Sequence, residues 1–481
     1  MNIHRLLQNV KYTGNPGNFD TDFVTDDSRK VRSGCVFVRS KGGSFDGHTF
    51  AEKAVEIGAK LIVAERDTGV ENQILVENSR QAYALMCGNL FDNPAKKLKM
   101  IGITGTNGKT TSAFLIKDLL QQMGKQVGLM GTVQNMIGSQ VIPAKFTTPQ
   151  PYELNALLSQ MYKSGCEYAV METSSQALAQ NRLYGIKFDV GVFTNLTQDH
   201  LDYHKTMENY FDAKCLLFQN SEKIVVNYDD PYGKKVAERF KDKEVITFSD
   251  RDNTADYTAR NIEYSSKNVK FLMVAKGSIN RVDFPMPGEY SVHNAMGAAL
   301  ALIALGFDET EVCTALNHVH GVKGRCEILV KEPFKVICDY AHTDDGLKNV
   351  LSSLRPFVKG RFIVLFGCAG ERDSAKRILM AHAVADYADY VFLTSDNPRG
   401  ENPQSIIDSV SGYFDEKKVP YTAEVDRRKA INSALNMLQY NDTLILCGKG
   451  HEDYQVLNGI TVYLDEHDIV KKFMDNYNKE N

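Results

Sequence analysis

The chain has 481 residues, of which 43% are hydrophobic and 24% are charged, so intrinsic disorder and a fibrous architecture are excluded. Its 56 lysines and arginines nearly balance 60 aspartates and glutamates, for a net charge of −4, which argues against nucleic acid or a membrane as the main partner. No stretch approaches the roughly 20 apolar residues that span a bilayer, and nine scattered cysteines without a C-x-x-C pair favour a reducing compartment, so we expect a cytoplasmic protein.

Short apolar runs alternate with amphipathic stretches along most of the chain, which predicts strands and helices around mostly parallel sheets. In the first section we expect strands at 35–39 and 60–65 and helices that begin near His48 and Ser79. The segment DNPAKKLK at 92–99 combines a turn signal with a basic run, so we predict the first domain boundary there.

The second section is predicted to contain, in chain order, strands at 100–104, 168–173, 190–196 and 223–228, an antiparallel insertion at 256–285 and a helix at 293–306. Strands KVICDYA, RFIVLFG, DYVFLTS and DTLILCG follow the glycine-containing segment 321–325. At roughly 150 residues per domain, the length also suggests three domains. We therefore predict an α/β fold with a smaller amino-terminal domain at 1–98, a central P-loop domain at 99–322 and a Rossmann-like domain at 323–481.

The segment ITGTNGKTTS at 103–112 lies between a predicted strand and a predicted helix. Its glycines let backbone N–H groups approach phosphate oxygens, Lys109 can reach the β- and γ-phosphates, and the Thr110 hydroxyl suits Mg²⁺. The strict P-loop pattern fails at its first glycine position, where Ile103 stands. The context still predicts a nucleoside triphosphate bound by Gly105, Thr106, Asn107, Gly108, Lys109, Thr110 and Thr111.

Two further polar residues follow predicted strands. Glu172 lies at the end of YAVMET and His200 follows VGVFTNL, at the sheet edge where open α/β sheets bind ligands. A carboxylate there could hold a metal near the triphosphate, whereas a helix-terminal charge and a structural histidine are the alternatives. Lys214 lies among Phe, Cys and Leu in a helical stretch, which by itself suggests a lysine that extends its charge to the surface.

The variant TGTNGKTT resembles the P-loop of the Mur ligase family, ATP-dependent enzymes that build the peptidoglycan stem peptide. Other motifs occur in the family's order: METSSQAL, TNLTQDHLDYH, FDAKCLLF, GEYSVHNAMGA, GRCE, DYAHTDDGL, SDNPRGENP and GKGHEDYQ. These motifs extend from residue 171 to residue 455, so the resemblance covers most of the chain. Within the family, DNPR together with GKGHEDYQ is similar to the enzymes that add the third amino acid.

The resemblance implies a magnesium site and a set of nucleotide contacts. The implied metal ligands are Thr110, Glu172, His200 and a carbamate formed on Lys214. Lys109, Lys214 and His200 are implied to be catalytic, and ATP is implied to contact His293, Asn294, Arg325 and Asp339 as well. The carbamate rests on the resemblance alone.

Two substrate sites follow from the same resemblance. The site for the UDP-MurNAc dipeptide would comprise Ser28, Gly43, Ser44, Phe45, Thr147, Thr148, Ser174, Gln180 and Arg182. The site for the incoming amino acid would comprise Arg372, Asp396, Asn397, Pro398, Arg399, Gly448 and Glu452. Arginines that fork onto carboxylates, together with nearby acidic groups, suit a zwitterionic diamino diacid.

We therefore expect ATP-dependent ligation of meso-diaminopimelate to the D-glutamate of UDP-MurNAc-L-Ala-D-Glu through an acyl phosphate, by a monomer. His342 or a carboxylate near it is the candidate general base. The same ligation with L-lysine is an alternative, and folylpolyglutamate synthase shares the P-loop and the lysine carbamate. A P-loop switch or scaffold protein that binds nucleotide without ligating anything is the alternative of a different class.

Overall fold

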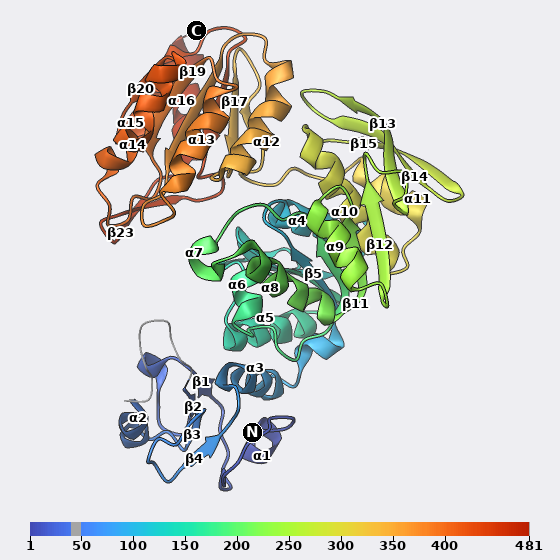
Figure 1. Cartoon of the computed structure of the whole chain (residues 1–481), viewed down its shortest axis with the longest axis vertical. Helices are drawn as coiled ribbons and strands as arrows, with labels where there is room; N and C mark the ends of the chain where they lie inside the picture. The colour runs from blue at the N-terminus through green and yellow to red at the C-terminus, as the bar shows by residue number, and fades with distance from the viewer. Residues whose placement is uncertain (40–49, 481) are drawn as a thin grey trace. The chain divides into compact units, whose positions relative to one another are not determined.

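The structure is a computed structural model that describes residues 1–39 and 50–480 (Figure 1). It divides into two compact units. The first contains residues 1–196, 203–247 and 300–307, and the second contains residues 197–202, 248–299 and those from 308 onward. Three elements contain residues of both units: α7 (Leu201–His204), β12 (Glu244–Ser249) and α10 (Glu289–Ala304).

The amino-terminal part of the first unit is built on a four-stranded parallel sheet in the order β1-β2-β3-β4. Its elements are β1 (Val24–Thr25), β2 (Val36–Val38), β3 (Leu61–Ala64), β4 (Gln73–Leu75), α1 (Ile3–Leu6), α2 (Ala51–Ile57) and α3 (Ser79–Leu90), with 3₁₀ turns η1 (Ser28–Lys30) and η3 (Pro94–Lys97). All residues of β2 and β3 are buried, because apolar side chains pack on both faces of the sheet. The strands expected at 35–39 and 60–65 and the helix near Ser79 are confirmed, whereas His48 lies outside the described residues.

The rest of the first unit contains a larger sheet in the order β11-β10-β5-β9-β6-β7-β8. Its strands are β5 (Lys99–Thr104), β6 (Val127–Met130), β7 (Gln134–Ile137), β8 (Gln140–Pro143), β9 (Tyr168–Glu172), β10 (Phe188–Phe193) and β11 (Ser221–Asn227). Its helices are α4 (Lys109–Gln122), α5 (Pro151–Lys163), α6 (Ser175–Ala179), α8 (Met207–Gln219) and α9 (Pro231–Arg239). The five strands from β11 to β6 are parallel. Ile103 pairs with Glu172 and Thr104 pairs with Phe193, so the segments after β5, β9 and β10 leave the sheet at one edge.

The second unit begins with the predicted antiparallel insertion. Its strands β13 (Tyr257–Tyr264), β14 (Val269–Ala275) and β15 (Ser278–Phe284) pair antiparallel in sequence, and β12 pairs with β13 in parallel. Helix α11 (Glu309–Leu316) follows α10. The change of rhythm at 256–285 in the sequence is therefore confirmed as a change from parallel to antiparallel pairing.

The carboxyl-terminal part of the second unit is a six-stranded sheet in the order β16-β17-β21-β18-β19-β20, parallel except for β16. Its strands are β16 (Glu327–Val330), β17 (Lys335–Asp339), β18 (Phe362–Cys368), β19 (Tyr390–Ser395), β20 (Tyr421–Ala423) and β21 (Thr443–Cys447). The other elements are α12 (Asp344–Leu354), η4 (Arg355–Phe357), α13 (Ala375–Ala385), α14 (Pro403–Lys417), α15 (Arg427–Met437), α16 (Glu466–Glu480) and the hairpin β22 (Tyr454–Leu457) and β23 (Ile460–Tyr463).

Two apolar clusters cover the faces of this six-stranded sheet. One contains side chains of α12, α13 and α14, such as Leu347 and Ile406, and the other contains side chains of α15 and α16, such as Ala430 and Ile469. Burial on both faces explains the nearly continuous apolar runs of its four predicted strands, which are all confirmed. Within residues 1–39 and 50–480, no helix is long and apolar enough to cross a bilayer.

Candidate active site

The predicted P-loop connects β5 to α4 in the first unit. Gly108 precedes the helix with φ of +83°, a left-handed conformation that glycine adopts without steric cost. A Cβ added to Gly105 would lie 1.8 Å from the Thr194 hydroxyl, so only glycine fits there. The amide groups of Thr106 and Asn107 donate to the main-chain and side-chain oxygens of Asn195, each at 2.9 Å. The segment after β10 therefore holds this loop in shape.

Two lysines contact the inside of the P-loop. Lys109 Nζ donates to the carbonyl oxygens of Gly105 and Thr106, at 2.9 and 2.8 Å. Lys214 of α8 is only 1% exposed, and its Nζ donates to the Gly105 oxygen at 2.8 Å and lies 4.5 Å from the centre of the Tyr210 ring. The interpretation of Lys214 as a surface lysine is therefore wrong, because the side chain of α8 at this position points into the interior.

Glu172 is fully buried at the end of β9. Its carboxylate accepts hydrogen bonds from the hydroxyls of Thr110 and Thr132 and from the Thr132 amide, all at 2.9 Å. The structure thus brings together a P-loop hydroxyl and a strand-end carboxylate, two of the oxygen donors that Mg²⁺ prefers. Of the other predicted metal ligands, Lys214 lies in this unit and His200 belongs to the second.

Five residues predicted for the UDP-dipeptide site lie near the carboxyl end of β9, and four of them, Thr148, Ser174, Gln180 and Arg182, are joined by hydrogen bonds. The Thr148 hydroxyl donates to the Glu172 carbonyl at 2.8 Å and accepts from the Ser174 amide at 3.0 Å. Arg182 donates through Nη1 to the Thr148 carbonyl at 2.8 Å and through Nη2 to Oε1 of Gln180 at 2.7 Å. The Thr147 hydroxyl lies 3.0 Å from that of Thr132.

The other residues predicted for this site belong to the amino-terminal part. Ser28 is the first residue of η1, whose amino end is capped by Asp27. Burial is the main cause that raises the pKa of the neighbouring Asp26. The predicted contacts at Gly43, Ser44 and Phe45 lie outside the described residues.

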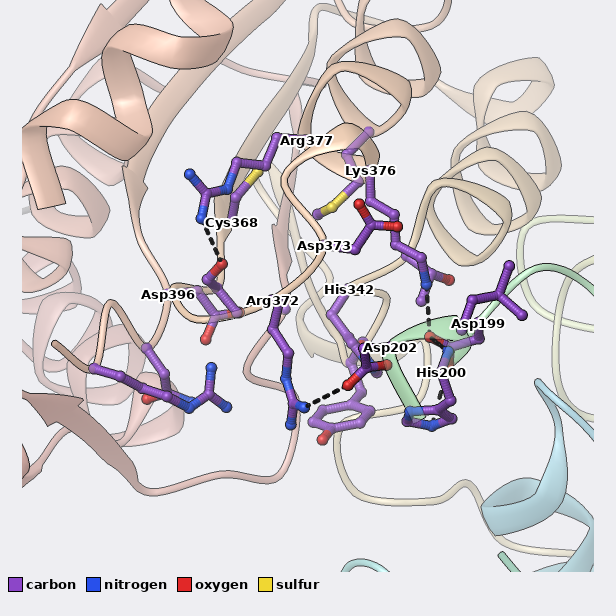
Figure 2. A pocket seen from close by; sticks show the side chains of 18 of the residues that line it. Asp199, His200, Asp202, His342, Cys368, Arg372, Asp373, Lys376, Arg377 and Asp396 are labelled. Carbon is purple, nitrogen blue, oxygen red and sulfur yellow. Dashed lines mark hydrogen bonds and ion pairs between the residues drawn. The ribbon is translucent and has the colours of Figure 1, made fainter. Parts of the chain in front are cut away.

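In the second unit, a cavity of about 170 Å³ opens where the strands of the six-stranded sheet end (Figure 2). Its lining includes six of the seven residues predicted for the amino-acid site: Arg372, Asp396, Asn397, Arg399, Gly448 and Glu452. Pro398 is not among the lining residues, but its carbonyl would lie 2.0 Å from a Cβ added to Gly370. The loops after β18 and β19 therefore touch backbone to backbone beside the cavity.

A fully buried lysine organises the acidic end of this cavity. Lys449 has no exposed surface, and its Nζ donates to Asn397 Oδ1 and Glu452 Oε2, both at 2.8 Å. The same Nζ lies 3.4 Å from Asp396 Oδ1, and the Tyr340 hydroxyl donates to Glu452 at 3.3 Å. Three predicted site residues thus share one ammonium group.

Arg399 lies in the loop after β19 and has a left-handed backbone conformation, with φ of +53°. Its Nη1 donates to the Gly370 carbonyl at 2.6 Å. Its amide donates to the Val456 carbonyl at 3.1 Å, and the Asn458 amide donates to the Arg399 carbonyl at 2.7 Å. The hairpin of β22 and β23 therefore holds the backbone of Arg399 in this unusual conformation.

The segment 197–202 contributes charged groups to the same cavity, as Figure 2 shows. Asp199 accepts from Lys376 Nζ at 2.6 Å and lies 3.4 Å from His200 Nε2. Burial raises the pKa of Asp199, but the positive charges of His200 and Lys376 outweigh it and hold the pKa well below its usual range. Arg372 points toward Asp202, at 3.9 Å. His342 also lines the cavity, and its Nδ1 lies 2.9 Å from the Tyr340 carbonyl.

The remaining predicted nucleotide contacts also lie in the second unit. Asp339 ends β17, and its carboxylate accepts from the amides of Cys326 and Ala341 at 2.6 and 2.7 Å. Burial is the largest cause that raises the pKa of Asp339, although the Arg325 guanidinium opposes it. Arg325 itself stacks 4.6 Å from the centre of the Tyr340 ring. His293 and Asn294 are neighbours on α10, where His293 Nε2 lies 3.5 Å from Asp250 Oδ1.

Comparison with known proteins matches three family models along the chain. Residues 20–103 match the Mur ligase family catalytic domain, residues 103–302 the Mur ligase middle domain, and residues 324–450 the Mur ligase glutamate ligase domain. A protein of Clostridium tetani named UDP-N-acetylmuramoyl-L-alanyl-D-glutamate--2,6-diaminopimelate ligase is 42% identical over 99% of both chains. The chain belongs to the Mur ligase family.

Other relatives of this Mur ligase carry the same kind of name. A Clostridium acetobutylicum protein named UDP-N-acetylmuramoyl-L-alanyl-D-glutamate--2,6-diaminopimelate ligase 1 is 43% identical over 98% of this chain and 99% of its own. A solved structure titled as a UDP-N-acetylmuramoyl-L-alanyl-D-glutamate--2,6-diaminopimelate ligase has a TM-score of 0.70 and 33% identity, and covers 95% of both chains. The three-domain α/β fold class is thereby confirmed, and the boundaries at 98/99 and 322/323 stay a prediction.

Sequence reasoning missed two residues of the Mur ligase site, Lys449 and Gln455. Gln455 donates through Nε2 to the Ser395 carbonyl at 3.2 Å and also to the Asp396 carbonyl. Both residues lie within the motif GKGHEDYQ, but neither was assigned a role. The glycines on either side of Lys449 were the available signal, because a charged residue in a tight turn after a buried strand is placed near the sheet edge.

Proposed function

We propose that this chain is an ATP-dependent ligase that joins meso-diaminopimelate to the D-glutamate of UDP-MurNAc-L-Ala-D-Glu. One observation carries the proposal: the cavity of the second unit combines the guanidinium groups of Arg372 and Arg399 with the carboxylates of Asp396 and Glu452. Both charge signs are thus available to a zwitterion with more than one carboxylate. The names of relatives about 42% identical along the whole chain support the same substrates.

The choice of diaminopimelate over L-lysine rests on charge. Diaminopimelate carries one carboxylate more than lysine, and a forked guanidinium such as that of Arg399 matches this group. An arginine that faced the lone terminal ammonium of lysine would make a like-charge contact, which is disfavoured in a desolvated pocket. The alternative with L-lysine is therefore the weaker one.

The nucleotide site is proposed for the P-loop of the first unit, and the predicted contacts His293, Asn294, Arg325 and Asp339, which belong to the second unit, stay a prediction from the resemblance. The P-loop amides and Lys109 would bind the phosphates of ATP. Thr110, Glu172 and a carbamate on Lys214 would hold Mg²⁺, which neutralises phosphate charge when bound. His200 of the second unit stays a ligand that the resemblance predicts. The buried contact of Thr110 with Glu172 at 2.9 Å fits such hard oxygen ligands.

The chemistry follows from these groups. The γ-phosphoryl group of ATP passes to the side-chain carboxylate of D-glutamate, which gives an acyl phosphate and ADP. The neutral amine of diaminopimelate then forms a bond to the acyl carbon, and phosphate leaves. His342 is the proposed base for the amine proton: it lines the cavity, and its Nδ1 lies 2.9 Å from the Tyr340 carbonyl, a contact that orients the ring. The cluster of Thr147, Thr148, Ser174, Gln180 and Arg182, with Ser28, would bind the UDP-dipeptide.

Phosphate release and product mass test this proposal. The purified chain is given ATP, Mg²⁺ and UDP-MurNAc-L-Ala-D-Glu with meso-diaminopimelate, L-lysine or no amino acid. We expect release that requires both cosubstrates, a tripeptide product, and at least roughly a hundredfold preference for diaminopimelate over lysine, about 2.7 kcal/mol. Phosphate release that depends on neither the UDP-dipeptide nor the amino acid would favour a nucleotide-binding switch. Equal use of diaminopimelate and lysine would favour the alternative in which the chain ligates L-lysine.

A further inference from the structure

Lys449 is a fully buried lysine behind the cavity of the second unit. It has no exposed surface, and its Nζ contacts Asn397 and Glu452 at 2.8 Å and Asp396 at 3.4 Å. The ring of Tyr454 closes a further side, with its centre 5.4 Å from Nζ. Burial of an ammonium group is costly unless it is paired and hydrogen-bonded. Here Asp396, Asn397 and Glu452 belong to the wall of the cavity, and Tyr454 belongs to the neighbouring hairpin.

The backbone around Lys449 directs the side chain inward. Gly448 and Gly450 have φ of +107° and +52°, conformations that L side chains rarely adopt. A Cβ on Gly448 would lie 3.0 Å from Asp396 Oδ2, and one on Gly450 would lie 2.8 Å from the Gly324 carbonyl. The two glycines therefore let the chain pass close to the loops after β19 and before β16, while the lysine between them enters the space behind the cavity.

Asp396, Glu452 and Lys449 together have a net charge of −1. Asp396 and Glu452 carry two negative charges, and Lys449 carries one positive charge. Both acidic residues also line the cavity. Without the ammonium group between them, the two acidic side chains would repel each other and separate.

We propose that Lys449 is a positioning residue that determines specificity for the amino acid. It holds the side chains of Asp396, Asn397 and Glu452 in the arrangement that receives the distal ammonium group of the incoming diamino acid, and together with the two carboxylates it forms a group with a net charge of −1. The proposal rests on the proposed function. It assigns Lys449 no contact with the reacting atoms.

A comparison of two substrates in two proteins tests the proposal. The ratio of kcat/KM for meso-diaminopimelate to that for 2-aminopimelate, which lacks the distal amine, measures recognition of the distal ammonium. We expect a ratio of at least about a hundred in the wild type. In Lys449→Gln, which keeps a hydrogen-bond donor but removes the charge, the ratio should fall at least tenfold, mainly through KM for diaminopimelate. The KM for ATP should stay unchanged.

Two further variants complete the test. Lys243 donates to the carbonyls of Phe218, Gln219 and Ser221 at 2.8 to 2.9 Å, so Lys243→Gln is a matched loss of a hydrogen-bonded lysine that should keep the ratio. Lys449→Met matches the length of the lysine stem but removes the charge, so its ratio should also fall at least about tenfold. If the glutamine variant does not fold, as judged by thermal melting, a folded Lys449→Met decides, and the wild-type ratio in that variant would overturn the inference.

The outcomes separate the two proposals. A wild type that ligates no diaminopimelate defeats the proposed function, and the inference with it. A wild type with the expected ratio, together with a folded Lys449→Gln that loses activity equally toward both substrates, overturns the inference alone, because a purely structural lysine would act on both substrates alike.

Discussion

Lys109 and Lys214 share one hydrogen-bond acceptor, since the Nζ atoms of both donate to the carbonyl oxygen of Gly105, at 2.9 and 2.8 Å. Two ammonium groups this close repel each other, and the burial of Lys214 weakens the screening by water. A neutral amine is the form that adds carbon dioxide, and conversion of Lys214 to an anionic carbamate would turn the repulsion into attraction.

The first prediction concerns this lysine. Lys214→Ala should lower ligation at least roughly a hundredfold, because the proposed carbamate ligand and the contact with the P-loop are lost together. Formate or acetate at high concentration should restore part of the activity by supplying the missing carboxylate. Phosphate release with and without the added acid measures both effects. Lys117→Ala removes another lysine of the first unit, which is 8% exposed and bonded to Gln121, and should not respond to added acid. Full activity of untreated Lys214→Ala would contradict the carbamate.

The second prediction concerns Arg399. Arg399→Ala should lower kcat/KM for meso-diaminopimelate at least roughly tenfold, because a guanidinium that binds a carboxylate contributes about 1.5–3 kcal/mol. It should not create activity with L-lysine, since removal of a positive charge adds no partner for the lysine ammonium. The comparison needs both amino acids and the control Arg428→Ala, whose guanidinium donates to the Tyr463 carbonyl at 3.4 Å. Undiminished use of diaminopimelate would show that Arg399 does not read its carboxylate.

The sequence predicted the strands and the motif positions well, because buried parallel strands leave nearly continuous apolar runs, as in β18 and β21. It did not predict the burial of Lys214, since one lysine on an amphipathic helix has the same local pattern whether its side chain faces solvent or a P-loop. It also did not predict Lys449. Its partners, Asp396 and Asn397, lie more than 50 residues away in the chain, and only the parallel pairing of β21 and β18 with their neighbours brings these segments together.

The third prediction concerns the buried ion pair of Arg427 and Glu466, both fully buried, with Nη2 and Oε1 at 2.7 Å. Arg427 also donates to the Cys447 carbonyl at 2.7 Å, at the strand end just before Gly448. Arg427→Met leaves the Glu466 carboxylate buried without its partner, so it should destabilise the second unit by about 3–5 kcal/mol.

The double variant Arg427→Met, Glu466→Leu separates the charge from the packing. It should be more stable than Arg427→Met alone, because no uncompensated charge remains in the interior. Urea unfolding followed by tyrosine fluorescence gives the free energy of unfolding of the wild type, of Arg427→Met and of the double variant. A double variant less stable than Arg427→Met would contradict this prediction. It would mean that the buried, unpaired Glu466 carboxylate is not what destabilises the single variant.

The last prediction concerns pH and the pair of Glu327 and His467, whose Oε2 and Nε2 lie 2.9 Å apart. The hydrogen bond with Glu327 is the main cause that raises the pKa of His467 above its ordinary value of 6.5, although burial opposes it. Burial raises the pKa of Glu327, but His467 and the Gly324 amide outweigh it and lower the pKa below 4.5. The stabilisation from His467 is thus fully present below pH 6.5 and is lost as the pH rises through its folded-state pKa. That from Glu327 is present above pH 4.5 and is lost as the pH falls through its own.

The pair should therefore stabilise the fold most between pH 4.5 and 6.5. We expect the melting temperature of His467→Gln to lie furthest below that of the wild type near pH 6, and the difference to shrink as the pH rises through the folded-state pKa of His467, where the wild-type imidazole loses its proton. Melting curves of both proteins across this range give the difference directly. Glu327→Gln is the matched control: without this carboxylate the same histidine substitution should have an effect that depends less on pH, and the part that remains comes from Asp465, whose Oδ1 lies 3.0 Å from His467 Nδ1. If the difference in melting temperature between the wild type and His467→Gln did not change with pH, His467 would act through packing and not through its charge.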